Sequence, residues 1–387
     1  MKNKIDKNLV QVLSAIPSFQ EDLECIVYVK DFNSALKNLK KEKIKVRATF
    51  PFINALSLQL SRKKLNKLLT CNFVKYVSSQ THVFALMNVA KKILKIEESA
   101  TGKDISVAYI DTGINPHLDF VLGENRIIKF IDLINNRVFA YDDNGHGTFV
   151  CGVGSGNGLM SNKKYTGIAP KSNIVAIKAL NEQGEANSIK ILEAMQWIYD
   201  NRDKYGIKVV CMSFGSEPLG VNDPIMKGAE ELWKNGITVV AAAGNSGPEY
   251  ETIKSPGVSP KIITVGGFND NRINDYTYNE KFFEIAEFSS RGPALKRFKP
   301  DVIAPSVNIV SCGTNEFYTS LSGTSVAAPM IAGVCALSYE KNYNIKPDIL
   351  KKLITSCSKA ITYNNNIEGF GIPDVEQLLN NKTVFFN

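Results

Sequence analysis

The sequence lacks any long hydrophobic run, since none approaches the roughly 18 apolar residues that a membrane-spanning helix needs. It has no internal repeat or low-complexity tract. Its seven cysteines are an odd set without the close pairs of a zinc ribbon or a small disulfide scaffold. These absences argue against a membrane-spanning, fibrous or disulfide-stapled protein. The composition, 44% hydrophobic and 22% charged, is that of a soluble globular chain.

The first residues do not resemble a secretory signal. Asp6 lies among the early lysines, and the apolar stretch 9–16 is short and interrupted by polar residues. An acidic run over 20–24 follows, with no small-residue cleavage site. Together with the cysteine pattern, this favours a cytoplasmic location. Export by another route stays open.

The net charge of +8 is unevenly distributed along the chain. Residues 1–95 hold 18 of the 46 Lys and Arg and 6 of the 38 Asp and Glu, a net charge of +12, whereas residues 96–387 have a net charge of −4. A basic segment of this kind is often a solvated face. Because opposite charges favour docking, association with the acidic remainder explains it better than nucleic-acid binding, which we do not expect.

Four domains or segments are predicted from the patterns. Residues 1–24 are an N-terminal extension without an assigned role. Residues 25–80 alternate β-α-β-β-α-β, the order of a ferredoxin-like α+β domain, and Ser61 is a candidate N-cap. Residues 81–100 form a linker with a short helical middle. Residues 101–387 form a larger α/β domain.

The larger domain shows short, nearly continuous apolar runs between longer helical patterns. Strands buried on both faces have this pattern, so a parallel sheet flanked by helices is expected. The predicted strands are 105–110, 174–179, 207–213, 237–243 and 262–265. The predicted helices are 146–154, 188–204, 222–235, 325–341 and 347–357.

Four polar residues lie next to the predicted strands and helices, each within a distinctive short sequence motif. Asp111 ends a strand in D-T-G, His146 lies between glycines in G-H-G-T, Asn245 follows a strand in A-A-G-N-S-G, and Ser325 opens a helix in G-T-S-V-A-A-P. Each string alone also fits a turn or a tightly packed helix start. Of the other two histidines, His82 falls in the linker and His117 is expected at solvent.

The four residues follow one another at intervals of 35, 99 and 80 positions. This combination is far more specific for one protein family than any single string. With Y-T-G-I-A-P, F-S-S-R-G-P and K-P-D-V-I-A-P, they make residues 103–378 resemble the subtilisin-like (subtilase) serine proteases. Within that family, the chain resembles the AprX-type intracellular bacterial branch. The resemblance implies a subtilisin-like parallel sheet flanked by helices, and makes the ferredoxin-like domain an N-terminal pro-domain.

The resemblance also implies roles for individual residues. Ser325 would attack a peptide carbonyl, His146 would take its proton, Asp111 would orient His146, and Asn245 would stabilise the oxyanion. No cofactor is then required for the chemistry, and the substrates are peptides or proteins. The residues expected to line the substrate groove are Asn144, Gly184, Glu185, Ala186, Ser213, Phe214, Gly215, Ala242, Ala243 and Gly244.

Some positions leave alternatives open. Cys151 is either a thiol that makes activity sensitive to modification or an inert, packed residue. Asp119 matches a calcium ligand of the family, but the usual ligand loop is not recognisable at 154–166, so structural calcium is only a candidate. The family resemblance of I-K-S-P-G-V-S-P implies that Lys254 lies near the base of the pocket for the P1 residue, whose carbonyl is attacked. Its ammonium faces either that pocket or solvent.

The pro-domain is expected to act as intramolecular chaperone and inhibitor. Self-cleavage is predicted within 80–92, after Leu86 or Met87, because Val83–Met87 offers apolar side chains to a groove. Two alternatives remain from the sequence: a dedicated processing protease for one partner, and an inactive subtilase that serves as a scaffold.

Overall fold

A computed structural model describes residues 4–5, 23–42, 44–51, 54–79, 87–96, 100–272, 278–315 and 317–381. The chain divides into two compact units, Met1–Val83 and Phe84–Asn387. The predicted cut after Leu86 and most of the extension 1–24 lie outside the described residues, as does His82. Within the described part, no helix is both long enough and apolar enough to cross a bilayer.

The first unit has the predicted β-α-β-β-α-β order, with an antiparallel sheet ordered β2-β3-β1-β4. Leu56, Leu58 and Leu60 of the sheet are buried against Leu65 and Leu68 of a helix, so the helical face and the strand face share one core. The side chain of Ser61 accepts a hydrogen bond from the N–H of Lys64, which confirms the N-cap. The elements are β1 (Leu23–Val29), α2 (Phe32–Lys41), β2 (Lys45–Phe50), β3 (Ala55–Leu60), α3 (Arg62–Leu69) and β4 (Val74–Ser79).

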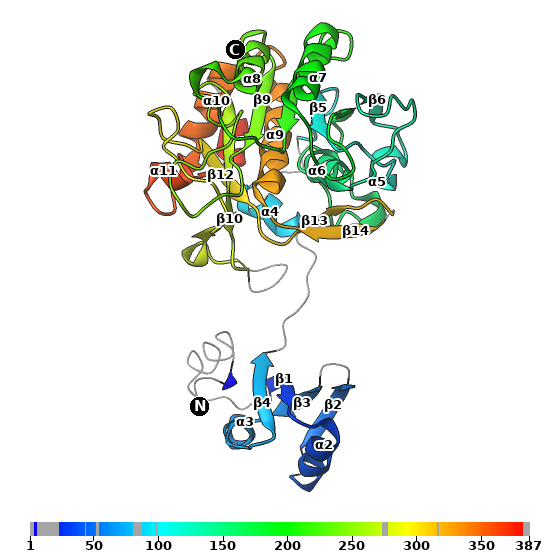
Figure 1. The fold of residues 1–387 in the computed structure, drawn as a ribbon, viewed down its shortest axis with the longest axis vertical. Coiled ribbons are helices and arrows are strands. Elements are labelled where there is room, and N and C mark those ends of the chain that lie inside the picture. The colour runs from blue at the N-terminus through cyan, green and yellow to red at the C-terminus, as the bar shows by residue number, and fades with distance from the viewer. Residues whose placement is uncertain are drawn as a thin grey trace. The chain divides into compact units, whose positions relative to one another are not determined.

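The second unit is built on a mixed, mostly parallel sheet ordered β11-β10-β9-β8-β5-β7-β6, with β12 paired to β10 (Figure 1). Among the described strands of this sheet, only β11 runs antiparallel to its neighbour. The predicted parallel sheet is therefore confirmed. Its strands are β5 (Ser106–Asp111), β6 (Ile127–Asp132), β7 (Asn173–Lys178), β8 (Ile207–Met212), β9 (Thr238–Ala242), β10 (Ile263–Asn269), β11 (Glu284–Ile285) and β12 (Val302–Pro305).

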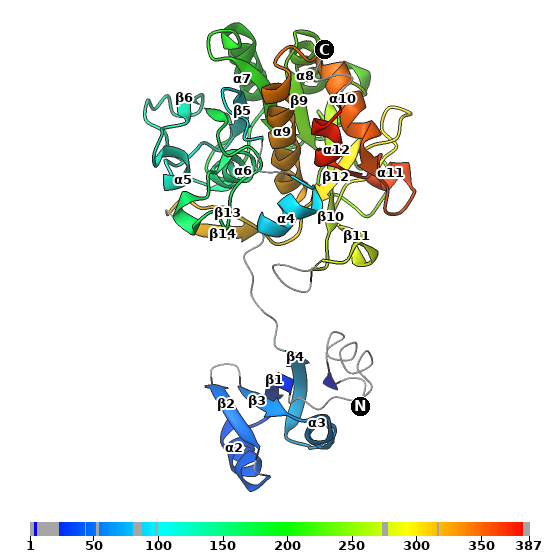
Figure 2. The same cartoon turned by 180° about the vertical axis from the view of Figure 1, so that it is seen from behind.

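Helices pack on this sheet, and Figure 2 shows α9 in front of it with α10 and α12 beside it. Helix α9 packs against β8, β9 and β10 and also against α6, whereas α7 and α8 pack together. The helices are α4 (Met87–Ile93), α5 (Leu118–Val121), α6 (His146–Ser155), α7 (Ser188–Asn201), α8 (Pro224–Lys234), α9 (Thr324–Lys341), α10 (Pro347–Ser356), α11 (Asn365–Glu368) and α12 (Val375–Leu379).

Two small antiparallel pairs complete the second unit. The hairpin of β13 (Ile309–Cys312) and β14 (Tyr318–Leu321) packs on α6, and β15 (Ser358–Lys359) pairs with β16 (Ile372–Pro373).

The carboxyl ends of β5, β8 and β9 lie at one edge of the sheet, because these strands are parallel neighbours. Ligand sites form at such an edge.

Candidate active site

Asp111 and His146 form the first pair of the site. Asp111 is the buried last residue of β5, and its Oδ1 lies 2.8 Å from His146 Nδ1. A carboxylate can only accept, so Nδ1 carries the ring proton and the neutral ring presents the lone pair of Nε2. Burial alone would lower the pKa of His146, but the charge of Asp111 and its hydrogen bond outweigh burial and raise the pKa above the ordinary 6.5.

Asp142 anchors the turn that presents His146 at the start of α6. Its carboxylate accepts hydrogen bonds from the N–H groups of Gly145 and Thr148 and from the hydroxyls of Thr148 and Thr112, at 2.6–2.9 Å. Burial alone would raise the pKa of Asp142, but these hydrogen bonds outweigh burial and lower it. One buried carboxylate therefore joins the end of β5 to the first turn of α6. The sequence analysis did not single out Asp142.

Ser325 and Asn245 meet at Gly323. A Cβ placed on Gly323 would lie 3.2 Å from Ser325 Oγ and 3.1 Å from Asn245 Nδ2. Gly323 also has a φ of +153°, which disfavours a side chain. The space in front of Gly323 is thus bordered by a hydroxyl and an amide N–H donor. A carbonyl group placed there would meet a nucleophile and a hydrogen-bond donor together.

His146 and Ser325 lie on two helices that pack against each other. His146 opens α6 and Ser325 lies in the first turn of α9, and these helices pack side by side (Figures 1 and 2). Within the described residues, no hydrogen bond joins Ser325 Oγ to the His146 ring. The N-cap residue of this 18-residue helix, Gly323, has no side chain, and the Asn245 Oδ1 atom accepts the N–H of Thr324 at the positive end of the helix.

The segments expected to line the groove lie around this site, but they are not strands. Residues 213–215 continue irregularly after β8, and 184–186 lie in a turn and coil before α7. Within the described residues, neither segment has a neighbouring strand to pair with, so neither is a strand. Ala242 ends β9, with Ala243 and Gly244 directly after it.

Asn144 links the His146 turn to the 184–186 segment. Its Nδ2 donates to Glu182 O at 3.0 Å, and its Oδ1 accepts from the N–H of His146 at 3.1 Å. Asn144 is exposed and lies beside Gly184. Asn144 therefore holds the turn before α6 next to the 184–186 segment.

A cavity of about 490 Å³ that the sequence analysis did not predict is lined in part by His146. The hairpin β13–β14 and the turn before α6 line it, with Thr314, Phe317 and Leu321 on one side and Asn144 on the other. The hairpin strands are only four residues long, and β14 is largely exposed. Such short strands give little periodic signal, which is why the hairpin was missed.

Cys151 is fully buried in α6, and burial raises the pKa of its thiol well above the usual range. A protonated, enclosed thiol is a poor nucleophile. The structure thus favours the inert alternative over thiol sensitivity.

Asp119, the candidate calcium ligand, is surrounded by hydrogen-bond donors. Its Oδ1 accepts from the N–H of Met160 at 3.0 Å, and its Oδ2 accepts from the Tyr318 hydroxyl at 2.7 Å and the Cys312 thiol at 3.7 Å. Calcium instead needs several oxygen ligands directed at one point. The described surroundings of Asp119 therefore do not fit calcium.

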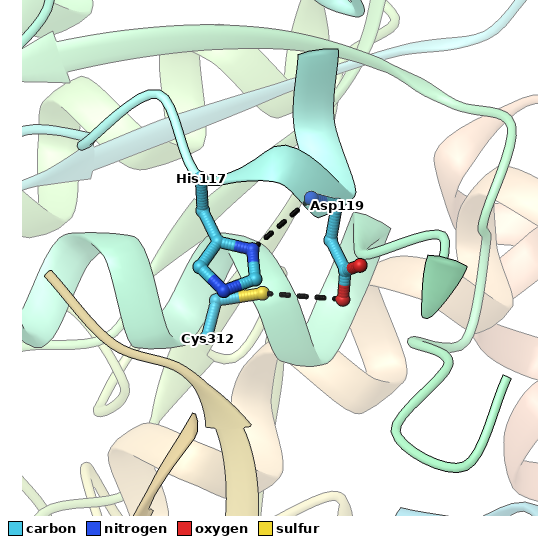
Figure 3. A group of neighbouring side chains, drawn as sticks. All are labelled: His117, Asp119 and Cys312. Atoms are coloured by element: carbon cyan, nitrogen blue, oxygen red, sulfur yellow. Dashed lines mark hydrogen bonds between the residues drawn. The ribbon is translucent and has the colours of Figure 1, made fainter. Parts of the chain in front are cut away.

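His117 and Cys312 join Asp119 in a buried group whose candidate ligand atoms lie within 4.8 Å of one another (Figure 3). The sequence analysis expected His117 at solvent, which is wrong, because its ring packs edge-on against Phe120 and Tyr318. Its Nδ1 accepts the N–H of Asp119, so Nε2 carries the proton. Burial raises the pKa of Cys312 well above the usual range. A protonated ring nitrogen and a protonated thiol do not suit a transition metal either.

Comparison with known proteins agrees with this geometry. A model of the subtilase family matches residues 102–371. The chain is 37% identical to "Serine protease AprX" of Bacillus subtilis (strain 168), over 94% of this chain and 87% of the relative. It is 31% identical to "Subtilisin DY" of Bacillus licheniformis, over 66% of this chain and 84% of the relative. The solved structure of "Sphericase" superposes with a TM-score of 0.63 at 27% identity, over 73% of this chain and 96% of that one.

The fold and the site thus define a serine hydrolase built on a subtilisin-like sheet. The chain belongs to the subtilase family and is a serine endopeptidase that acts on proteins or peptides. Members of this family need no cofactor for their chemistry. The family resemblance seen in the sequence is confirmed.

Proposed function

We propose that Ser325, His146 and Asp111 form the catalytic triad. The observation that carries this proposal is the Asp111–His146 hydrogen bond together with the approach of Ser325 Oγ and Asn245 Nδ2 to one point at Gly323. His146 Nε2 takes the proton as Ser325 Oγ attacks the peptide carbonyl. The oxyanion then accepts hydrogen bonds from Asn245 Nδ2 and the N–H of Ser325. His146 returns the proton to the leaving amine, and water releases the acyl group.

The substrate would lie extended between 184–186 and 213–215. Both segments end next to the site, and neither has a strand partner in the described structure. A peptide can supply the missing backbone partners by adding itself as a strand. The proposal therefore favours unfolded or loop segments as substrates.

A Ser325→Ala variant tests the triad. Peptide hydrolysis and labelling by a fluorophosphonate should both be lost, while the folded state persists. The fluorophosphonate also separates the enzyme from an inactive scaffold, since a scaffold would not be labelled. Hydrolysis that survives in well-folded Ser325→Ala protein would contradict the assignment.

We further propose that the N-terminal unit is a propeptide that inhibits the enzyme after self-cleavage within 80–92. The supporting observations are the compact unit ending at Val83 and the charge of +12 on residues 1–95 against −4 on the remainder. Because opposite charges steer association, the binding rate should fall as salt rises.

N-terminal sequencing of active enzyme tests this second proposal, with Ser325→Ala as the uncut control. Cleavage of purified Ser325→Ala protein would rule out self-processing. Wild-type protein that stays full length and fully active would make the N-terminal unit a permanent module instead.

A cytoplasmic location belongs to the same proposal. None of the seven cysteines forms a disulfide in the described structure, which suits a reducing compartment. Cell fractionation with an antibody to the chain tests it, and recovery of the enzyme from the medium would contradict it.

A further inference from the structure

Backbone hydrogen bonds hold Lys254 between the end of β9 and the loop after β8. Its N–H donates to Ala243 O at 2.9 Å, just after β9. The next residue, Ser255, exchanges two backbone hydrogen bonds with Ser216, at 2.9 and 3.0 Å. The Ser255 hydroxyl is buried and donates to Asp223 at 2.8 Å. The segment therefore spans from the end of β9 to the loop after β8 and is anchored at both.

The side chain of Lys254 fills the space between two glycines of the groove. A Cβ placed on Gly215 would lie 2.6 Å from Lys254 Cβ, and a Cβ placed on Gly244 would lie 2.5 Å from Lys254 Cγ. Neither glycine can carry a side chain while the lysine stem lies there. Gly244 directly precedes Asn245, so the stem closes the space beside the proposed oxyanion donor.

The ammonium of Lys254 forms an ion pair with Glu217. The Lys254 side chain is only 18% exposed, whereas that of Glu217 is 80% exposed. Ion pairs with a solvent-exposed partner contribute little free energy. A carboxylate brought in by a substrate could therefore take the place of Glu217, while the lysine stem stays fixed.

We propose that Lys254 determines specificity for the P1 residue and selects an acidic side chain there. This inference rests on the proposed function. A P1 side chain leaves the backbone next to the carbonyl held by Asn245, and between Gly215 and Gly244 it meets Lys254. Its carboxylate then pairs with the ammonium. The carboxylate of Glu217 competes with the substrate carboxylate for the ammonium of Lys254.

Two peptides that differ only in P1 Glu or P1 Gln test the inference, because these side chains have nearly the same shape. The measured quantity is the ratio of their kcat/KM values. Lys254→Met keeps the stem and removes the charge, and should lower the Glu/Gln ratio about tenfold or more. Glu217→Gln removes the competitor, and should raise the ratio about two- to fivefold.

Lys261→Met is the matched control, because Lys261 is also a lysine in an ion pair, with Glu230 at 3.7 Å, but is half exposed. It should leave the ratio unchanged. An equal shift in this variant would assign the effect to net charge and overturn the proposal. An unchanged ratio in both Lys254→Met and Glu217→Gln would also overturn it.

Wild-type cleavage of a third peptide with P1 Leu keeps the two proposals separate. If Ser325 cleaves this peptide while the Glu/Gln ratio of kcat/KM is the same in wild type and the variants of the Lys254–Glu217 pair, the protease assignment stands and the specificity inference fails. If no peptide is cut, the proposed function itself fails. Glu217→Gln lies at an exposed position, so it remains informative even if Lys254→Met does not fold.

Discussion

Thr324 orients the side-chain amide of Asn245. Asn245 Oδ1 accepts hydrogen bonds from both the N–H and the hydroxyl of Thr324, at 2.9 and 3.0 Å. The same hydroxyl accepts from the N–H of Gly244 at 3.1 Å. Since the amide oxygen is engaged, Nδ2 is the part of Asn245 that faces the space near Ser325 Oγ. A reversed amide would place an oxygen against the developing oxyanion.

We therefore expect Thr324→Val to lower kcat about tenfold with little change in KM, because the amide loses one of the two bonds that set its orientation. Asn245→Ala, which removes the donor itself, should lower kcat about 10²–10³-fold. Steady-state kinetics on one peptide measures both. Thr324→Ser restores the hydroxyl and should restore most of kcat. A loss confined to KM in Thr324→Val would contradict this positioning role.

The ionisation of His146 should set the acid limb of activity. His146 acts as a base only when neutral, and its pKa is raised above 6.5, so activity should fall as the pH drops through a value above 6.5. Asp111→Asn should move this pKa down and lower kcat about 10⁴-fold. NMR titration of the ring protons in Ser325→Ala protein measures the pKa directly, with only three histidines to assign. A His146 pKa that Asp111→Asn leaves unchanged would argue against the pair.

Asp142 should stabilise the fold in a pH-dependent way. Its folded-state pKa lies below the ordinary 3.8, so its contribution is present above that value and is lost as the pH falls through the folded pKa. Asp142→Ala should lower the free energy of unfolding by about 1–3 kcal/mol at neutral pH, because buried donors lose their acceptor. Urea unfolding of the Ser325→Ala protein measures this. The difference between variants should shrink below pH 4, and a constant difference would contradict the assignment.

Calcium should not act through Asp119. Its carboxylate is already engaged by Met160 N–H, the Tyr318 hydroxyl and the Cys312 thiol. The change in Tm caused by calcium or by a chelator should thus be the same in wild type and Asp119→Asn. Tyr318→Phe should lower stability by about 1–2 kcal/mol, because a buried acceptor loses a donor. If calcium raises the Tm of wild type but not of Asp119→Asn, the ion must displace the hydrogen-bond donors from the Asp119 carboxylate, which would contradict this prediction.

The sequence predicted the interior strands of the second unit to within a few residues. β5, β7, β8 and β9 are covered on both faces, so their residues form continuous apolar runs. The edge strand β6 is only partly buried and includes Lys129, and β12 contains Pro305, so neither was predicted. Local sequence motifs were enough to predict the site residues, because the chemistry needs those residue types next to glycines and strand ends. These residues are Asp111, His146, Asn245 and Ser325.

Only the tertiary structure decided what surrounds these residues. The amide of Asn245 is oriented by Thr324 on a different element, and the Asp142 carboxylate joins β5 to α6. Lys254 lies 37 residues from Glu217, and Asp119 lies 199 residues from Tyr318, yet each pair is in contact. Hydrogen bonds and ion pairs form between atoms that packing brings within a few ångströms. The sequence by itself therefore determined which residues could do the chemistry, and the packing of the sheet and helices decided which of them meet.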